Sequence, residues 1–258
     1  MVEKSIREIG QEKQKLRELG IGGTAIGTGI NAGKEYKKLV IGFLSKNSGE
    51  KFTAGKDAIE LTQNMDSFLE LSNALSVYAG DLLKICNDLV LLNSGPKTGI
   101  GEIVLPAVEP GSSIMPGKVN PSIPEATIMC CIQVLGNDHA IEMGVHRGQL
   151  ELNVLTPVIA FNLFSSITLL SNASKMLEQK CIKGIKANKQ RALNLLEHSA
   201  IFATALNPVL GYEKVAEIVK EANKSGKTIK EIVVFEKKLL KEKEFDKIVD
   251  LKKLAKEK

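Results

Sequence analysis

Residues 54–93 read AGKDAIELTQNMDSFLELSNALSVYAGDLLKICNDLVLLN. Apolar side chains recur along this stretch three and four positions apart, which is the spacing of an α-helix. They are too many for one narrow stripe, and a helix that is apolar around much of its girth is buried by neighbours on several sides. The stretch therefore predicts one member of a bundle of long helices, whose other members come from the rest of the chain.

Helical spacing returns in four further segments. We expect an amphipathic helix over residues 1–19, a helix over 35–45, and long helices over 122–143 and 150–183. Pro157 lies near the start of the last one, where it either occupies the first turns or kinks the helix. No segment alternates with period two, so no sheet is expected. The sequence predicts an all-α fold.

The last part of the chain has shorter helical pieces with clear breaks. The breaks are Asn207-Pro208, Gly211 and Ser225-Gly226, and a capping box at residues 228–231 marks the next helix start. We therefore expect two domains. The first is a central helical bundle over 1–184 that includes the loop 94–121, and the second is a small helical C-terminal domain over 185–258.

Composition excludes several classes of protein. The 258 residues are 43% hydrophobic and 25% charged, as in ordinary soluble domains and unlike disordered chains. No apolar run is long enough to cross a membrane, and the N-terminus lacks the apolar core of a signal peptide, so a cytoplasmic location is expected. Most of the net charge of +5 comes from the lysine-rich residues 237–258. They lack arginine clusters and interleaved aromatics, so we expect neither nucleic acid nor membrane as a partner.

Cysteine and glycine patterns exclude two further kinds of site. Cys86, Cys130, Cys131 and Cys181 form no CxxC pair and lie in apolar stretches, so they are expected to be reduced core residues rather than disulfides or zinc ligands. Residues 20–25 fit a GxGxxA pattern, but a dinucleotide site requires a strand before it, and a polar helix is expected there instead.

The segment with the most chemistry is GSSIMPGKVNP, residues 111–121. Two adjacent hydroxyl groups, Ser112 and Ser113, are followed by the ammonium group of Lys118 and the carboxamide of Asn120. An ammonium and a carboxamide together suit a carboxylate or phosphate ligand, and a serine held in such a positive field has its ionised form stabilised. The alternative without a functional site is that the serines are turn residues and the lysine is a surface charge.

A helix start follows this loop directly. Ser122-Ile-Pro-Glu125 matches a capping box with proline near the first helical position. Helix N-termini present unpaired N–H groups and a partial positive charge, which would add to the anion site. In the alternative interpretation, without a functional site, Glu125 only caps the helix.

Residues 111–121 resemble the signature of the fumarase/aspartase superfamily. Other segments match the family along nearly the whole chain, namely residues 22–31, 84–89, 94–96, 148–154 and 206–212. The resemblance implies the central helical-bundle domain of that fold followed by its small C-terminal domain. It also implies a homotetramer that acts on a small dicarboxylate substrate without an organic cofactor, and no metal-ligand spacing is present.

The resemblance assigns roles to the residues of the signature. It implies that Ser112 is a general base, which takes a proton from the carbon next to a substrate carboxylate. Lys118, Asn120 and loop N–H groups would stabilise the resulting aci-carboxylate, since stabilising charge where it develops is a large catalytic effect. Ser113 would contact the substrate, and Glu125 would orient an active-site histidine.

The choice of reaction rests on smaller matches. Residues 62–66, 84–88 and 148–152 are more similar to aspartate ammonia-lyases, and residues 99–103 lean towards class II fumarate hydratases. We favour the release of ammonia from aspartate, with fumarate hydration as the alternative.

A third possibility is a non-catalytic helical assembly fragment. Family chains are longer, and we expect the family's N-terminal domain, with its partner histidine, to be absent here. His139, His146 and His198 lie outside matching motifs and are expected to be structural. A catalytic form would then require a separate chain that carries the missing regions.

Overall fold

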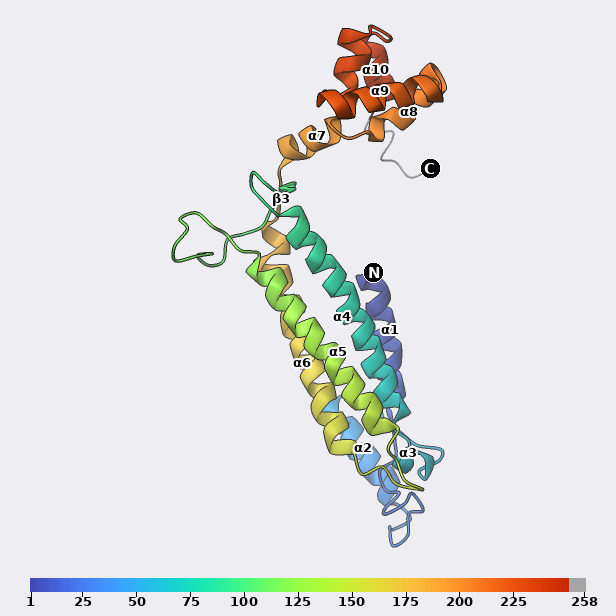
Figure 1. Cartoon of the computed structure of the whole chain (residues 1–258). Coiled ribbons are helices and arrows are strands. Elements are labelled where there is room, and N and C mark those ends of the chain that lie inside the picture. Colours follow the sequence, from blue (N-terminus) through green and yellow to red (C-terminus); the bar gives the residue numbers. More distant parts are fainter. Residues whose placement is uncertain (251–258) are drawn as a thin grey trace. The chain divides into compact units, whose positions relative to one another are not determined.

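The computed structural model of the chain describes residues 1–250, and the lysine-rich residues 251–258 lie outside the described part (Figure 1). The chain divides into two compact units. The bundle unit comprises residues 1–93 and 105–185, and the C-terminal unit comprises residues 94–104 and the chain from residue 186. Residues 94–104 are thus grouped with the C-terminal unit, whereas the sequence predicts the whole loop 94–121 in the bundle.

Four helices form the body of the bundle unit. α4 (Asp66–Leu92), α5 (Ser122–Val145) and α6 (Thr156–Lys180) pack along one another, and α1 (Val2–Lys15) packs on α4. Figure 1 shows α4 and α6 running in one direction and α5 running in the opposite direction. Pro157 lies in the first turn of α6, where its missing N–H group has no helical partner to lose. The prediction of an all-α bundle of long helices is confirmed.

Short elements accompany these helices. α2 (Tyr36–Ser48) and α3 (Glu60–Gln63) belong to the bundle unit, as does the short 3₁₀ helix η1 (Ile182–Gly184). β1 (Glu18–Leu19) pairs in parallel with β2 (Thr53–Ala54).

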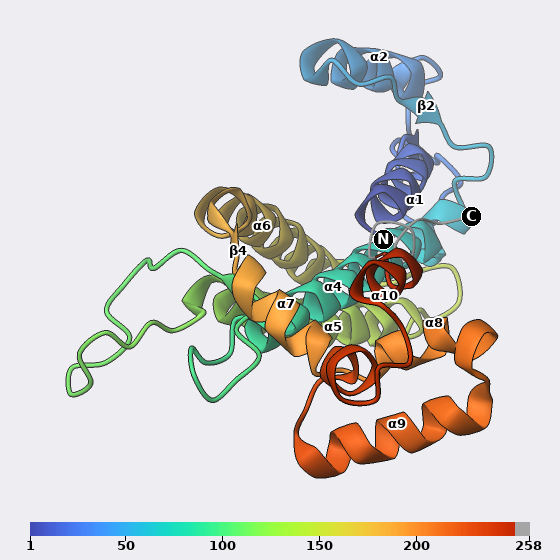
Figure 2. The same ribbon diagram turned by 90° about the horizontal axis from the view of Figure 1, so that it is seen from above.

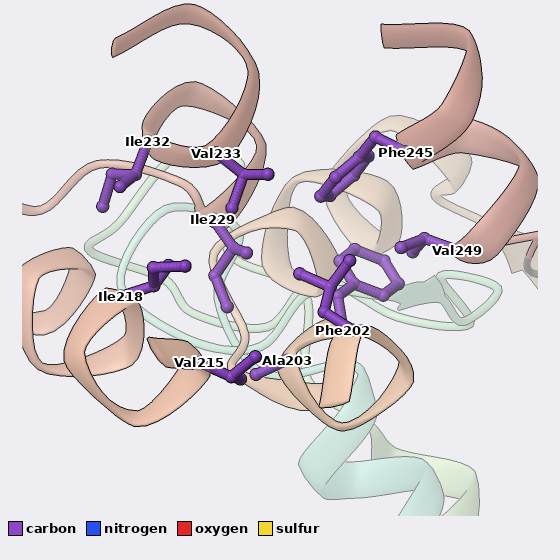
Figure 3. Packing of buried hydrophobic residues seen from close by; sticks show 10 residues of the cluster. Phe202, Ala203, Val215, Ile218, Ile229, Ile232, Val233, Phe245 and Val249 are labelled. Carbon is purple, nitrogen blue, oxygen red and sulfur yellow. The ribbon is translucent and has the colours of Figure 1, made fainter. Parts of the chain in front are cut away.

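Up to Asp250, the C-terminal unit contains five helical pieces. They are α7 (Lys189–Glu197), α8 (Ile201–Leu210), α9 (Tyr212–Ser225), the π-helical η2 (Glu231–Glu236) and α10 (Glu242–Ile248). Their apolar side chains meet in one core, which Figure 3 shows from close by.

Local signals for helix ends within this unit had mixed outcomes. The capping box before η2 is confirmed, because the Thr228 N–H group donates to Glu231 Oε2 at 2.7 Å and the Glu231 N–H group donates to Thr228 Oγ1 at 3.1 Å. The break expected at Asn207-Pro208 is wrong, since α8 continues through Pro208 to Leu210. The break expected at Gly211 is confirmed, since α8 ends at Leu210 and the φ of 79° at Gly211 suits a residue without a side chain.

The expectation of no sheet is also wrong in detail. Besides the β1–β2 pair, β3 (Ile103–Val104) pairs antiparallel with β4 (Lys186–Ala187) within the C-terminal unit. Each strand has two residues, which is too short to show a period-two pattern. No helix of the described residues is long and apolar enough to cross a membrane.

The buried thiols lie in the bundle unit. Cys86 on α4 and Cys131 on α5 have no exposed surface, and Cys181 follows α6 with 1% exposed. All four cysteines are free, as predicted. Burial raises the pKa of the Cys86 thiol to about 12 and that of Cys131 to about 11, because a thiolate is poorly solvated among apolar side chains.

These two thiols predict a loss of stability in alkaline solution. The unfolded chain releases the two protons near pH 9, whereas the folded bundle retains them to about pH 11–12. The free energy of unfolding should therefore fall as pH rises from about 9, by about 1.4 kcal/mol per pH unit for each thiol. Urea unfolding followed by circular dichroism between pH 8 and 11 measures this slope. The double variant Cys86→Ala/Cys131→Ala should show a shallower slope, and an equal slope would contradict the assignment.

Candidate active site

The signature segment forms a loop that leads into α5. The loop that contains this segment begins after Leu105. Leu105 is buried, and its N–H group donates to Asn93 Oδ1 at 3.0 Å. Figures 1 and 2 both show the loop extending away from α4, α5 and α6 before it returns to the start of α5. One end of the loop is thus fixed to the end of α4 and the other to the start of α5.

One backbone and one side-chain hydrogen bond close the tip of this loop into a ring. The Gly111 N–H group donates to the Lys118 carbonyl at 3.0 Å, and Asn120 Nδ2 donates to the Gly111 carbonyl at 3.1 Å. A side chain at residue 111 would bring its Cβ within 2.5 Å of the Lys118 carbonyl oxygen, so the position requires glycine. Gly117 has a φ of 78°, which also favours glycine. The residues between Gly111 and Asn120 are therefore held as one turn.

Ser112 lies inside this turn with its hydroxyl oxygen facing two donors. Its Oγ accepts hydrogen bonds from the Ile114 N–H group at 3.1 Å and the Met115 N–H group at 3.2 Å. Such bonds occur in ordinary serine turns, and they also stabilise an oxygen that carries negative charge. The side chain is half-buried, while Ser113 beside it is exposed. The positive field expected at Ser112 thus comes first from the loop's own backbone.

The two charged residues of the predicted site remain unengaged. Lys118 and Glu125 are exposed, and neither side chain forms a hydrogen bond or an ion pair with another described residue. Glu125 lies in the first turn of α5 and not in the closed turn of the loop. The structure therefore brings Ser112 and Asn120 together through Gly111, and leaves both charges available to groups from outside.

The capping box expected at the start of α5 is wrong. Pro121 occupies the N-cap position, so Ser122 is already inside the first turn and its side chain caps no N–H group. The Ser122 hydroxyl instead donates to the Glu109 carboxylate. This contact joins the two arms of the loop, and sequence reasoning missed it because the two residues carry no shared local pattern.

The three histidines lie away from this loop in sequence and make local contacts. His139 Nδ1 lies 3.1 Å from Glu142 Oε2 on the exposed face of α5, and His146 follows the last residue of that helix. His198 Nδ1 lies 2.8 Å from the Asn194 carbonyl in the C-terminal unit. No group of His, Cys, Asp or Glu side chains within residues 1–250 could hold a metal ion.

Apolar side chains of the loop have no cover in this chain. Ile114 is 86% exposed, and Met115 and Val119 are also exposed. Three exposed apolar side chains within a few residues are typical of a surface that another molecule or chain covers. The loop thus presents a polar turn framed by apolar side chains.

The ring of hydrogen bonds predicts the behaviour of an Asn120→Ala variant. Loss of the Asn120 bond to the Gly111 carbonyl should let the turn open more often, and one hydrogen bond is worth about 0.5–1.5 kcal/mol net. Hydrogen exchange at the Gly111 amide, measured by NMR, should then accelerate roughly 2- to 10-fold. Ser113→Ala is the matched control, because that exposed side chain makes no hydrogen bond among the described residues. Equal rates in both variants would contradict the role of Asn120.

Comparison with known proteins identifies the family. The family model described as lyase matches residues 1–136, and that described as fumarase C C-terminus matches residues 202–256. An aspartate ammonia-lyase of Pseudomonas aeruginosa is 51% identical over 87% of this chain and 47% of its own length. One of Helicobacter pylori is 44% identical over 96% and 53%. A class II fumarate hydratase of Bacillus cereus is 43% identical over 98% and 55%. The chain spans about half the length of these relatives.

Solved structures agree with the sequence comparison. A fumarate lyase (delta crystallin) from Brucella melitensis superimposes with a TM-score of 0.93 at 42% identity, over 99% of this chain and 55% of that one. A class II fumarase from Schistosoma mansoni gives 0.88 at 34% identity, over 96% and 55%. The helical bundle, the signature loop and these matches together place the chain in the fumarase/aspartase superfamily of lyases.

Proposed function

We propose that this chain carries the proton-abstracting loop of an aspartate ammonia-lyase, with Ser112 as the general base. The observation that carries the proposal is the pair of backbone N–H groups directed at Ser112 Oγ. A serine can take a proton only after it has lost its own, and donors aimed at its oxygen favour that ionised form. The similarity to aspartate ammonia-lyases supports the choice of aspartate as the substrate.

The proposed reaction has two steps. The Ser112 alkoxide takes a proton from the carbon next to a carboxylate of aspartate, and the C–H electron pair moves into that carboxylate to give an aci-carboxylate. The pair then returns to form the carbon–carbon double bond while the carbon–nitrogen bond breaks. The substrate's ammonium group leaves with the bonding pair as ammonia, and fumarate remains.

The groups of the loop suit the charge that develops. The aci-carboxylate carries two negative charges on one carboxyl group, and fixed donors at such a point lower the barrier. The Lys118 ammonium group has no partner among the described residues, and Asn120 retains a second amide hydrogen beyond the one bonded to Gly111. We assign Lys118, Asn120 and Ser113 to substrate binding, and Glu125 to the orientation of a histidine from another part of the assembly.

Exposed apolar side chains support an oligomer in which the site is completed. On α6, Phe161 is 70% exposed and Phe164 is 67% exposed, and Met129 on α5 is 69% exposed. Aromatic side chains this open to water are typical of covered interfaces. We infer a homotetramer, with the remaining site groups supplied by other subunits or by a separate chain. The four free thiols favour a reducing, cytoplasmic location.

Fumarate hydration is the second candidate. The observations that favour it are the match to a class II fumarate hydratase over nearly the whole chain and the sequence of residues 99–103. Both reactions abstract a proton next to a carboxylate, so the loop fits either one. A non-catalytic assembly fragment is the third candidate, and it requires that neither aspartate nor malate is converted.

Reconstitution separates these candidates. The chain is mixed with a polypeptide that carries the first half of the P. aeruginosa aspartate ammonia-lyase, and fumarate is followed by its ultraviolet absorbance. We expect fumarate from aspartate, and conversion of malate alone would favour the hydratase. Activity with neither substrate, in a mixture shown to assemble by sedimentation, would reject both enzymes.

Ser112→Ala tests the base within an active mixture. Loss of the proton acceptor should lower the turnover rate at least about 100-fold, because a positioned general base contributes roughly 10²–10⁴-fold. Assembly should stay intact. Ser225→Ala is the control and should keep full activity. Its exposed hydroxyl lies in the C-terminal unit and, among the described residues, bonds the Glu221 carbonyl and the Lys227 N–H group. If Ser112→Ala remains active, the base lies elsewhere.

A further inference from the structure

The first arm of the signature loop, residues 106–110, packs against the end of α6. A Cβ atom at position 184, where η1 ends, would lie 2.4 Å from Pro106 Cγ and 3.4 Å from Pro106 Cβ. Carbon atoms in ordinary contact are about 3.5–4.0 Å apart. The proline ring therefore occupies the space that a side chain at Gly184 would fill. Both residues belong to the bundle unit.

Gly184 is held in place by α6 and its continuation. The Gly184 N–H group donates to the Cys181 carbonyl at 3.0 Å, and the Cys181 N–H group donates to the Leu177 carbonyl on α6 at 3.1 Å. Cys181 and Leu177 are both buried. Because close-packed residues anchor this turn, Gly184 cannot move at low cost away from a group that approaches it.

Pro106 is restricted in the same way. Its ring is bonded to its own backbone nitrogen, so the ring cannot rotate aside as a flexible side chain would. The preceding residue, Leu105, is buried, and its N–H group donates to Asn93 Oδ1 at 3.0 Å. A methyl group added at position 184 must therefore displace the backbone of the arm by about 1 Å to restore ordinary contact.

The arm is stiff enough to pass such a displacement on towards the tip of the loop. Residues 106–110 read PAVEP. Pro106 and Pro110 have a fixed φ, and Glu109 is restricted to extended conformations because a proline follows it. The Glu109 carboxylate also accepts a hydrogen bond from the Ser122 hydroxyl in the first turn of α5. Three of the five residues thus have little torsional freedom, and the closed turn follows them directly.

We propose that Gly184 is a positioning residue for the signature loop. The absence of a side chain at this position lets Pro106 pack directly on the end of α6, and this contact sets where the arm holds the closed turn and Ser112. Gly184 acts only through Pro106. The consequence for the reaction rests on the proposed role of Ser112 as the base.

NMR of the chain alone tests the contact. Gly184→Ala should shift the amide resonances of Leu105 and Gly111, and exchange of the Leu105 amide should accelerate roughly 2- to 10-fold because its hydrogen bond weakens. Gly10→Ala is the matched control, since the same methyl group at that exposed position of α1 meets no neighbouring side chain within 4 Å among the described residues. An unchanged Gly111 resonance in Gly184→Ala would overturn the proposal.

A double-mutant cycle in the active reconstituted mixture tests the consequence for the reaction. Gly184→Ala should lower the turnover rate about 10- to 100-fold with assembly intact, since a displacement near 1 Å can cost about 100-fold. Pro106→Ala removes the ring carbon that the new methyl group meets. Adding Gly184→Ala to Pro106→Ala should therefore cause less than about a 2-fold further loss. Gly10→Ala should keep full activity.

The outcomes separate this inference from the proposed function. Equal losses from Gly184→Ala with and without Pro106→Ala would show a general structural role and overturn the proposal. A loss no larger than that of Gly10→Ala would overturn it as well. An unsubstituted mixture without activity would count against the proposed function alone, and the amide resonances of the chain would still decide the role of Gly184.

Discussion

Burial of apolar side chains between α4, α5 and α6 is the constraint on which the bundle unit depends. Each helix is apolar on more than one side, so none can exist alone in water. Because α5 runs opposite to its neighbours, the chain must cross from the end of α4 to the start of α5 at one end of the bundle (Figure 1). The signature loop lies in that crossing. Its position therefore follows from the packing of these three helices.

Hydrogen bonds between buried polar groups fix how these helices meet. Asn137 on α5 donates to Ser166 Oγ on α6 at 3.1 Å, and both residues are buried. Ser72 on α4 donates to Asp138 on α5. A buried polar group without a partner is costly, so each pair favours one register between its two helices. The apolar contacts hold the helices together, and these polar pairs select the register that places the ends of the loop.

The sequence predicts long-range features and local features with different success. Helix periodicity located the long helices, because burial on several sides leaves a pattern that any window reveals. The same capping-box pattern was right at residues 228–231 and wrong at residues 122–125. The difference is tertiary: Glu109 offers Ser122 a carboxylate from thirteen residues away, and a local motif carries no information on such a partner. The two-residue strands were not predicted from the sequence for the same reason, since only their pairing with distant residues defines them.

The candidate site divides into a part that the loop builds and a part that it leaves open. The sequence predicted a positive environment for Ser112 and assigned it to Lys118 and to a helix N-terminus. In the structure the donors at Ser112 Oγ are backbone N–H groups two and three residues along, in a turn that Gly111 and Asn120 close.

Backbone donors are in place before any ligand arrives, whereas the Lys118 ammonium group is exposed and unpaired within the described residues. Local geometry thus supplies the donors at the serine oxygen, and Lys118 is left available to a group from outside the described residues. Ile114 and Met115, which carry the two donor N–H groups, also expose their side chains. A chain that covers those side chains would bury the two hydrogen bonds and remove water from them, and hydrogen bonds to a charged oxygen strengthen as the local dielectric constant falls. If another chain covers this loop, as we propose, its association would therefore also strengthen the two hydrogen bonds to Ser112 Oγ.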